Sequence, residues 1–368
     1  MSTVEVDVTR IATTGEGVAR GPDGRTLFVA GALPGERVRA TVVEVRRRHG
    51  RAEAVAVLDP APGRRPPPCP HVADGCGGCD WQHATDELQS ALRRTIVHDA
   101  LTRIGRIADP VVEAGVTVAD PRRTTVRVAV TAAGRAGYRR RRSHDVVVPS
   151  TCMVVRPELE ALLVGGRYEG ADEVLLRVGA RTGEAAVDGT VHEEAGGRRW
   201  RVSPGSFFQP SAAAADALVE EVGAAVGPGG GGTMVDLAAG VGLFAGTVGA
   251  RFAEVVAVES SPSAVADAEA NLADRPVRVV RSTIERWAPE PAAAVVADPP
   301  RSGLAAVGVE KIVGTGAPTV VLVSCDAASL GRDAGLLVAA GYRLERSRVL
   351  DLFPQTAHVE VVSRFTCG

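Results

Sequence analysis

Residues 1 to 58 alternate apolar and polar side chains in short runs that glycines separate, as in VEVDV and RVRATVVEV. Alternation with a period of two over four to eight residues is typical of strands with one buried face. The pattern therefore predicts several short strands closed into a small OB-like β-barrel. A proline-rich stretch follows and cannot continue a sheet, so we predict a linker at residues 59 to 68.

A second unit is predicted over residues 69 to 200. Residues 85 to 104 have apolar side chains at helical spacing after Thr85, a good N-cap, and Gly105 would end the helix. From residue 122 to residue 200 the runs VRVAV, DVVVP and VLLRV, separated by polar turns, predict a β-rich domain.

From about residue 201 to residue 368 helical patterns alternate with fully apolar strands. We predict helices over residues 211–226, up to about 252, 262–273 and 326–340, and strands at TMVDLA, VVAVE, VRVV, AAVVADPP and TVVLVSC. This order predicts a Rossmann-like, doubly wound α/β domain, in which a buried parallel sheet carries helices on both faces.

Length and composition narrow the class of protein. The chain has 368 residues, 45% of them hydrophobic, which excludes a disordered chain and predicts more than one domain. No apolar run approaches the ~20 residues that cross a bilayer, so an integral membrane protein is excluded. The start, MSTVEVDVTR, lacks the features of a secretory signal, and we expect a cytoplasmic protein.

The net charge of −2 hides an asymmetry along the chain. Residues 1 to 210 carry 30 arginines against 26 acidic residues, and the remainder has 12 basic against 18 acidic residues. An excess this small is weak support for a polyanionic partner.

The first strand of the α/β domain leads into a glycine-containing turn, DLAAGVG, from Asp236 to Gly242. Gly240 and Gly242 let the backbone approach a ligand closely at the start of a helix. Glu259 ends the second strand, 17 residues beyond Gly242, where a carboxylate can hold both hydroxyls of a ribose. An NAD site would share these features, so they indicate a nucleotide cofactor without choosing it.

The sequence Asp298-Pro-Pro-Arg301 at the end of a later strand favours one cofactor. Acid-Pro-Pro loops at this place are typical of methyltransferases that act on planar nitrogen or carbon acceptors, so S-adenosylmethionine is favoured. The alternative is a rigid turn whose aspartate caps a helix.

Cys325 and Glu360 are the candidate nucleophile and base. Cys325 follows an apolar strand and precedes a predicted helix, whose N-terminus would lower the pKa of the thiol. His358 and Glu360 would face the same side of a strand, with His358 supporting Glu360 as general base. The alternatives are an inert buried cysteine and a solvated pair on an edge strand.

Five segments, SFFQPS, DLAAGVG, DPPRSG, SCDAASLGRD and DLFPQTAHVE, together resemble the bacterial RNA (uracil-5-)-methyltransferase family. The resemblance implies that Cys325 adds to C6 of a uracil and that Glu360 removes the proton from C5. It implies that Gln209 and Asp298 contact cofactor and base, that Asp298 belongs to the catalytic group, and that Glu259 binds the ribose. The remaining cofactor residues it implies are Asp236, Ala238, Gly240 and Gly242.

The sequence departs from the family pattern at two places. Leu243 stands where the family has an asparagine facing the cofactor, and Asp326-Ala327 replaces Asn-Pro after the nucleophile. Neither change touches Cys325 or Glu360.

Four cysteines, Cys69, Cys76, Cys79 and Cys152, form a candidate metal site. In a reducing compartment clustered cysteines indicate metal ligands rather than disulfides. Four thiolates fit a [4Fe–4S] cluster or zinc, and spacing alone does not decide between them. The family resemblance favours the iron–sulfur cluster, in a structural role.

RNA is the partner that the resemblance implies. The barrel resembles a TRAM domain, and residues 46–48, Arg51 and residues 139–142 are the basic candidates for RNA contact. The branch of the family with this barrel favours 23S rRNA over tRNA. The helix at 85–104 is expected to pack on the catalytic domain, and the protein is expected to be a monomer. A cytosine-5 methyltransferase and a non-catalytic RNA-binding protein are the alternatives.

Overall fold

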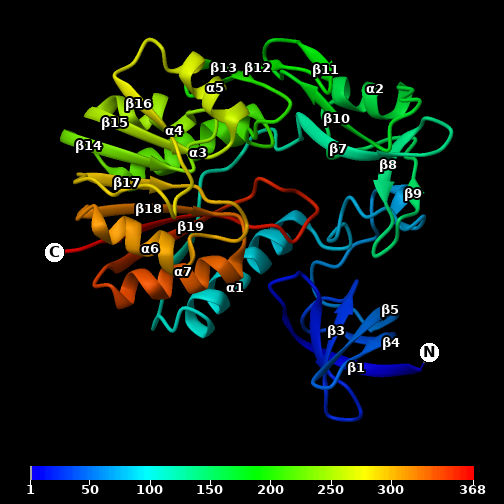
Figure 1. Ribbon diagram of the computed structural model, residues 1–368. Helices are drawn as coiled ribbons and strands as arrows, with labels where there is room; N and C mark the ends of the chain where they lie inside the picture. Colours follow the sequence, from blue (N-terminus) through cyan, green and yellow to red (C-terminus); the bar gives the residue numbers. More distant parts are fainter. Residues whose placement is uncertain (1) are drawn as a thin grey trace.

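Five strands at the N-terminus form a closed barrel, as predicted. The computed structural model describes residues 2–368, and Figure 1 shows the barrel in blue below the rest of the chain. Its order is β1-β2-β3-β5-β4, and Val29 and Val38 are fully buried inside it. The strands are β1 (Thr3–Ile11), β2 (Gly17–Arg20), β3 (Thr26–Ala30), β4 (Arg37–Val45) and β5 (His49–Asp59).

An irregular segment follows the barrel and contains one short 3₁₀ helix, η1 (Pro70–Val72). The long helix α1 (Asp86–Arg103) begins after Thr85, whose hydroxyl accepts a hydrogen bond from the N–H of Leu88. Helix α1 packs on α7 (Ala327–Ala339) of the catalytic domain. The two helices can approach closely because Gly331 has no side chain. A Cβ at this position would lie only 2.5 Å from the carbonyl oxygen of Ala100.

The central domain is a five-stranded antiparallel sheet in the order β11-β10-β7-β8-β9. Helix α2 (Pro157–Gly165), which the sequence analysis did not predict, covers it, and Leu159 and Leu163 are fully buried there. The strands are β7 (Thr125–Val130), β8 (Ala136–Arg139), β9 (Val146–Val147), β10 (Glu173–Val178) and β11 (Ala185–Val187).

The catalytic domain is built on an eight-stranded sheet in the order β16-β15-β14-β17-β18-β20-β19-β6. Seven of its strands run in the same direction, and only β20 runs antiparallel, pairing with both β18 and β19. The predicted parallel sheet is therefore mixed, because a short loop joins β19 to β20. The strands are β6 (Val112–Ala114), β14 (Gly230–Leu237), β15 (Phe252–Glu259), β16 (Val277–Arg281), β17 (Ala294–Ala297), β18 (Thr319–Ser324), β19 (Arg343–Leu350) and β20 (Glu360–Thr366).

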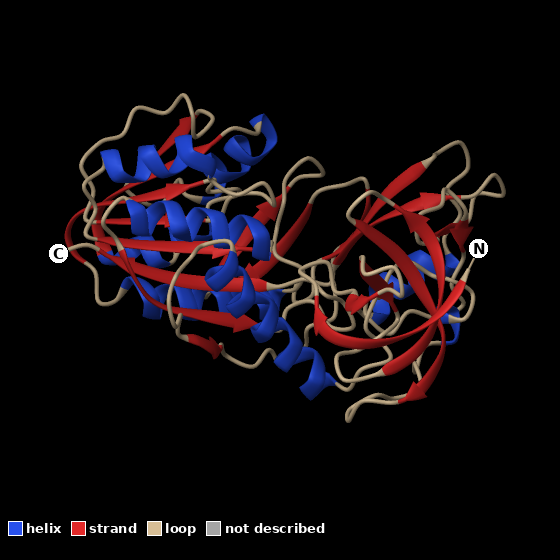
Figure 2. Ribbon diagram, turned by 90° about the horizontal axis from the view of Figure 1, so that it is seen from below, coloured by secondary structure: helices blue, strands red, loops and turns tan. Residues whose placement is uncertain are grey.

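Successive residues of these apolar strands point to opposite faces of the sheet, and each face is covered by helices (Figure 2). Val235 joins a cluster with α1, α6 and α7, whereas Met234 joins one with α3, α4 and α5. The further helices are α3 (Ala212–Val226), α4 (Leu243–Gly246), η2 (Val248–Arg251), α5 (Pro262–Asn271) and α6 (Ala305–Gly314). The predicted fold class is confirmed.

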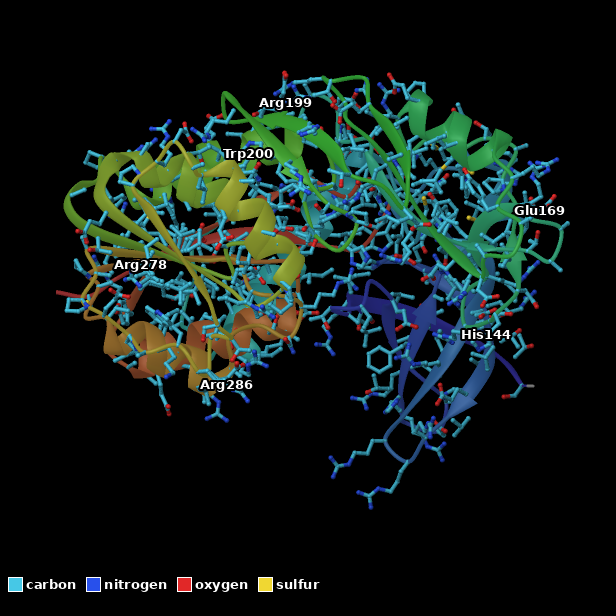
Figure 3. The ribbon with its side chains drawn as sticks, turned by 45° about the horizontal axis from the view of Figure 1, so that its top comes forward. His144, Glu169, Arg199, Trp200, Arg278 and Arg286 are labelled. Atoms are coloured by element: carbon cyan, nitrogen blue, oxygen red, sulfur yellow. The ribbon has the colours of Figure 1, made fainter. Side chains whose placement is uncertain are left out.

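The structure divides the chain differently from the predicted ranges. Helix α1 packs on the catalytic domain, as expected. Strand β6 joins the catalytic sheet, and the hairpin of β12 (Val191–Ala195) and β13 (Arg198–Val202) packs on α3 and α5, although the prediction placed residues 69–200 in the central domain. In β13, Trp200 is buried in the core of the catalytic domain, whereas the adjacent Arg199 is exposed (Figure 3).

Two helix predictions also need correction. The helix expected to reach about residue 252 is the short α4 followed by η2, because Gly246 and Gly249 disfavour a continuous helix. Gly246 packs so tightly that a Cβ there would lie 2.7 Å from the ring of Trp200. Helix α6 was not predicted. In residues 2–368 no helix has both the length and the apolar character that crossing a membrane requires.

Candidate active site

Three predicted site residues meet at one edge of the catalytic sheet. Asp298 follows β17 and Cys325 follows β18, and the carboxyl ends of neighbouring parallel strands meet at the same edge. Glu360 begins the antiparallel strand β20 and so lies at this edge too. Gln209 reaches the site from the loop before α3, where its Nε2 donates to Oδ2 of Asp298 at 3.3 Å.

Burial controls the protonation of these groups. Burial, together with the charges of Glu360 and Asp298, raises the pKa of Cys325 to about 12, and the charge of Arg301 opposes this shift. Burial also raises the pKa of Asp298 to about 7 and that of Glu360 well above its ordinary value. In the free protein the thiol therefore holds its proton at neutral pH.

The prediction that the helix N-terminus lowers the pKa of this thiol is wrong. Asp326 is the N-cap of α7, and its Oδ1 accepts the N–H of Ser329 at 2.8 Å. The residue that departs from the family pattern thus satisfies the helix terminus itself, while burial and two carboxylates dominate at Cys325.

His358 does not share a strand with Glu360, which corrects the predicted arrangement. It lies in the loop before β20, with its Nε2 3.4 Å from a guanidinium nitrogen of Arg301. Its ring meets that of Phe353 edge to face, with the centroids 5.8 Å apart. His358 is therefore placed to hold Arg301 rather than to support Glu360 directly.

The cofactor turn follows β14. Ala238 (φ 61°), Gly240 (φ 56°) and Gly242 (φ 94°) all adopt the left-handed conformation that turns the chain sharply into α4. The carboxylate of Glu259 accepts the N–H of Gly240 at 2.9 Å, which ties the turn to the end of β15. The same carboxylate accepts the N–H of Ser261 at 2.7 Å.

Asp236 lies fully buried beneath this turn. Its Oδ2 accepts the N–H of Ala245 at 2.9 Å, and its Oδ1 has no hydrogen-bond partner among residues 2–368. Burial raises its pKa to about 8. Leu243, which replaces the family's asparagine, is buried in the apolar core under the turn.

Two buried charged residues hold the loop that carries Gln209, and the sequence analysis missed both. Asp267 accepts hydrogen bonds from the N–H of Ser203 and the hydroxyl of Ser206. Arg177 donates to the carbonyl oxygens of the same two residues. Asp267 stands between two alanines in the predicted helix 262–273, and a short carboxylate within that alanine-rich stretch was the available signal.

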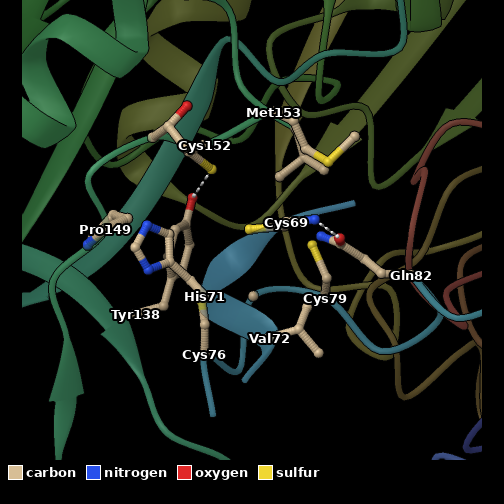
Figure 4. A pocket seen from close by; sticks show the side chains of 13 residues that line it. Cys69, His71, Val72, Cys76, Cys79, Gln82, Tyr138, Pro149, Cys152 and Met153 are labelled. Carbon is tan, nitrogen blue, oxygen red and sulfur yellow. Dashed lines mark hydrogen bonds between the residues drawn. The ribbon is translucent and has the colours of Figure 1, made fainter. Parts of the chain in front are cut away.

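The four predicted metal ligands line one pocket (Figure 4). Cys69, Cys76 and Cys79 come from the irregular segment after the barrel, and Cys152 comes from the loop before α2. The hydroxyl of Tyr138 lies 3.7 Å from the sulfur of Cys152. Within residues 2–368 no group of three or more His, Cys, Asp or Glu side chains is arranged to hold a metal ion.

Burial and, to a smaller extent, the charges of neighbouring cysteines raise the pKa of three of these thiols, that of Cys79 to about 11. Four thiolates in this pocket would repel one another and would need a cationic centre among them.

The predicted basic residues separate into two groups. Arg51 and residues 140–142 line a cleft between the barrel and the central domain, and residues 46–48 are exposed in the turn between β4 and β5. In the cleft Glu16 of the barrel accepts from Arg51 at 2.8 Å and from Arg142 at 2.9 Å. The arginine run thus also joins the central domain to the barrel.

The buried acids predict a pH-dependent stability. In an unfolded chain the carboxyl group of an aspartate has a pKa of about 4, whereas burial raises the pKa of Asp236 in the folded protein to about 8. Between these values the folded protein binds more protons than the unfolded chain, so the free energy of unfolding falls as pH rises. We expect the melting temperature of the ligand-free protein to fall from about pH 5 to about pH 8. In Asp236→Asn the fall should be smaller, and an unchanged slope would contradict this assignment.

The fold and the turn after β14 are those of S-adenosylmethionine-dependent methyltransferases. The TRAM domain family matches residues 1–55. The chain is 35% identical to an uncharacterized RNA methyltransferase of Streptomyces avermitilis, covering 98% of this chain and 97% of that protein. It is 33% identical to the 23S rRNA (uracil(1939)-C(5))-methyltransferase RlmD of Chromohalobacter salexigens, covering 96% of this chain and 87% of that protein.

Among solved structures, the chain resembles the Pyrococcus abyssi tRNA (uracil-54, C5)-methyltransferase in complex with S-adenosyl-L-homocysteine. The TM-score is 0.76 at 21% identity, covering 98% of this chain and 99% of that chain. The likeness therefore extends over all three domains of the fold. The protein belongs to the RNA (uracil-5-)-methyltransferase family.

Proposed function

We propose that this protein methylates C5 of a uridine in RNA with S-adenosylmethionine as methyl donor. The observation that carries the proposal is the meeting of Cys325, Asp298 and Glu360 at one edge of the sheet, with Gln209 on Asp298. The names of the relatives, among them 23S rRNA uracil-C5 methyltransferases, support the same activity.

The chemistry assigns a task to each of these residues. C5 of uracil is a poor nucleophile, so the Cys325 thiol gives up its proton to water and its sulfur adds to C6, while the electrons of the C5=C6 bond move toward C5 and O4. When bound, S-adenosylmethionine would supply the methyl group that C5 takes, and the broken methyl–sulfur bond would leave its electron pair on the sulfur of the donor. Glu360 then takes the C5 proton, the C5=C6 bond re-forms, and the C6–sulfur bond breaks to return the cysteine thiolate.

The side chains of Asp298 and Gln209 are the candidates for orienting the uracil and the methyl donor. Gln209 has a carboxamide, which offers both a donor and an acceptor to a base edge. The proposed cofactor contacts are Asp236, Ala238, Gly240, Gly242 and Glu259. Glu259 would bind the ribose hydroxyls and, through Gly240, keep the turn in place.

We favour 23S rRNA over tRNA as the substrate, since relatives that cover nearly the whole chain are named for 23S rRNA. The TRAM domain and the arginines of the cleft beside it supply an RNA-binding surface. This activity requires RNA and the methyl donor, which supports a cytoplasmic enzyme, and we propose that it acts as a monomer.

The experiment is nucleoside mass spectrometry of RNA treated with the purified enzyme and the methyl donor. We expect 5-methyluridine in 23S rRNA taken from a strain that lacks the gene. 5-Methylcytidine would indicate a cytosine-5 methyltransferase, and RNA binding without any methylation would indicate a non-catalytic RNA-binding protein. Either result would overturn the proposal.

We further propose that Cys69, Cys76, Cys79 and Cys152 hold a [4Fe–4S] cluster with a structural role. The four sulfurs line one pocket, and methyl transfer requires no electron. We expect the anaerobically purified protein to contain about four iron and four sulfide per chain and to show broad visible absorption. The variant Cys152→Ser should lose most of the iron, whereas Cys367→Ser should keep it. One zinc per chain and no iron would contradict the cluster.

A further inference from the structure

The loop of residues 351–359 brings the proposed base to the active site. It joins β19 to β20 and is closed at its base by the pairing of Leu350 with Glu360. Gln355 at its middle adopts φ 64°, a left-handed conformation that is strained for a residue with a Cβ. A loop of this kind keeps one conformation only when its surroundings fix it.

Arg93 of α1 contacts the whole length of this loop, although it lies more than 250 residues away in sequence. Its guanidinium donates to Oδ1 of Asp351 at 2.7 Å and to the carbonyl oxygen of Phe353 at 2.9 Å. It also donates to the carbonyl oxygens of Thr356 at 2.9 Å and His358 at 3.1 Å. One side chain thus holds both ends and the middle of the loop.

Gln89, one turn earlier on α1, holds the strained residue. Its Oε1 accepts the backbone N–H of Gln355 at 2.9 Å, and its Nε2 donates to the side-chain oxygen of Gln355 at 3.0 Å. The backbone carbonyl of Gln355 accepts the N–H groups of Asp80 and Trp81 at 2.8 and 2.9 Å. Both backbone polar groups of Gln355 are therefore satisfied in the left-handed conformation.

A charged side chain at position 93 is not explained by helix packing alone. Only 2% of Arg93 is exposed, and its one carboxylate partner, Asp351, has 44% of its side chain exposed. A buried charge carries a desolvation penalty, and an apolar residue would pack α1 on the sheet without it. What arginine adds is a planar fork that reaches several carbonyl oxygens at once.

We propose that Arg93 and Gln89 are positioning residues that fix the loop of residues 351–359 so that Glu360 stands at the C5 proton of the uracil. This inference rests on the proposed function. Arg93 and Gln89 touch neither the uracil nor the methyl donor in this role; they act through the loop. Cys325 sits on a different element, after β18, and does not depend on this loop.

The two steps of the reaction should therefore respond differently to a loosened loop. Attack by Cys325 on C6 makes the covalent adduct without the base. Release needs Glu360 to take the C5 proton while the electrons of that bond form C5=C6 and the C6–sulfur bond breaks to give thiolate. A displaced base leaves the methylated RNA attached to the enzyme.

The test compares Arg93→Lys and Gln89→Met with wild type and with Arg103→Lys, a matched control on the exposed face of α1. Each protein is mixed with ordinary uridine-containing 23S rRNA fragment and S-adenosylmethionine, and adduct and free methylated RNA are followed on denaturing gels. We expect both variants to accumulate the adduct and to release product more slowly by on the order of 100-fold. Arg103→Lys should behave as wild type.

The possible outcomes are distinguishable. Release at the wild-type rate in both variants would overturn the inference. A parallel loss of adduct formation and release, in a variant that still unfolds cooperatively and binds S-adenosyl-L-homocysteine, would reduce the two residues to structural support and overturn it as well. If Arg93→Lys does not fold, Gln89→Met decides. If wild type forms no adduct even with 5-fluorouracil RNA, the proposed function itself fails.

Discussion

Replacing Cys325 with alanine is expected to abolish methyl transfer to RNA, with a rate loss on the order of 10⁴-fold or more. Without the thiolate, C5 of the uracil never becomes nucleophilic, and no other cysteine is among the residues assigned to this edge of the sheet. Cys325 is only half-buried, so the fold should survive the loss of one sulfur atom. Transfer of labelled methyl groups from S-adenosylmethionine to RNA measures the effect.

Cys367→Ala is the matched control for this variant. Cys367 is equally half-buried, but it lies near the C-terminus against the carbonyl oxygen of Ala317. Its replacement should leave the rate of methyl transfer unchanged. A Cys325→Ala protein that still methylates RNA would show that the covalent mechanism is wrong.

Replacing Glu360 with glutamine should separate the two halves of the reaction. Glutamine keeps the shape of the side chain but cannot take the C5 proton, so release of the RNA should slow by about 10²–10⁴-fold. The covalent adduct should still form and should accumulate on ordinary uridine RNA. Denaturing gels of labelled RNA measure the adduct, and Glu345→Gln, a half-buried position near the start of β19, serves as control.

The fold of the Glu360→Gln variant should be intact. Burial raises the pKa of Glu360 well above its ordinary value, so a negative charge at this position is disfavoured in the folded protein. A neutral amide therefore adds no buried charge. If the variant released methylated RNA as fast as wild type, another residue would have to be the base.

Much of the fold could be predicted because period-two and apolar strand patterns are local. The barrel, α1 and the strands β14 to β18 fall where alternation, capping and uninterrupted apolar runs placed them. The antiparallel direction of β20 could not be predicted in this way, because the direction of a strand depends on the loop that precedes it. The packing of β12 and β13 on α3 and α5 depends on Trp200 joining the core of the catalytic domain, a long-range contact that sequence alone does not reveal.

The residues of the candidate active site could be predicted from the sequence, but the residues that hold them in position could not. Cys325, Asp298 and Glu360 stand at strand ends, a position that sequence patterns reveal. The pKa of Cys325 is raised, whereas the sequence predicted that it is lowered. Burial and the charges of two carboxylates that lie far from Cys325 in the sequence or on another strand outweigh a helix terminus that Asp326 already caps. The contacts of Arg93 join α1 to the loop before β20, and no local pattern connects segments so far apart. The available local signal was the presence of two polar side chains, Gln89 and Arg93, on the buried face of α1.

The most direct test of the covalent mechanism uses RNA with 5-fluorouracil at the target position. Fluorine at C5 cannot leave as a proton does, so an adduct formed with the methyl donor present stays on the enzyme. Digestion and mass spectrometry should find the modified nucleotide on the peptide that contains Cys325. Active enzyme that methylates ordinary RNA yet leaves the fluorinated RNA unattached, or attached at another residue, would contradict the account.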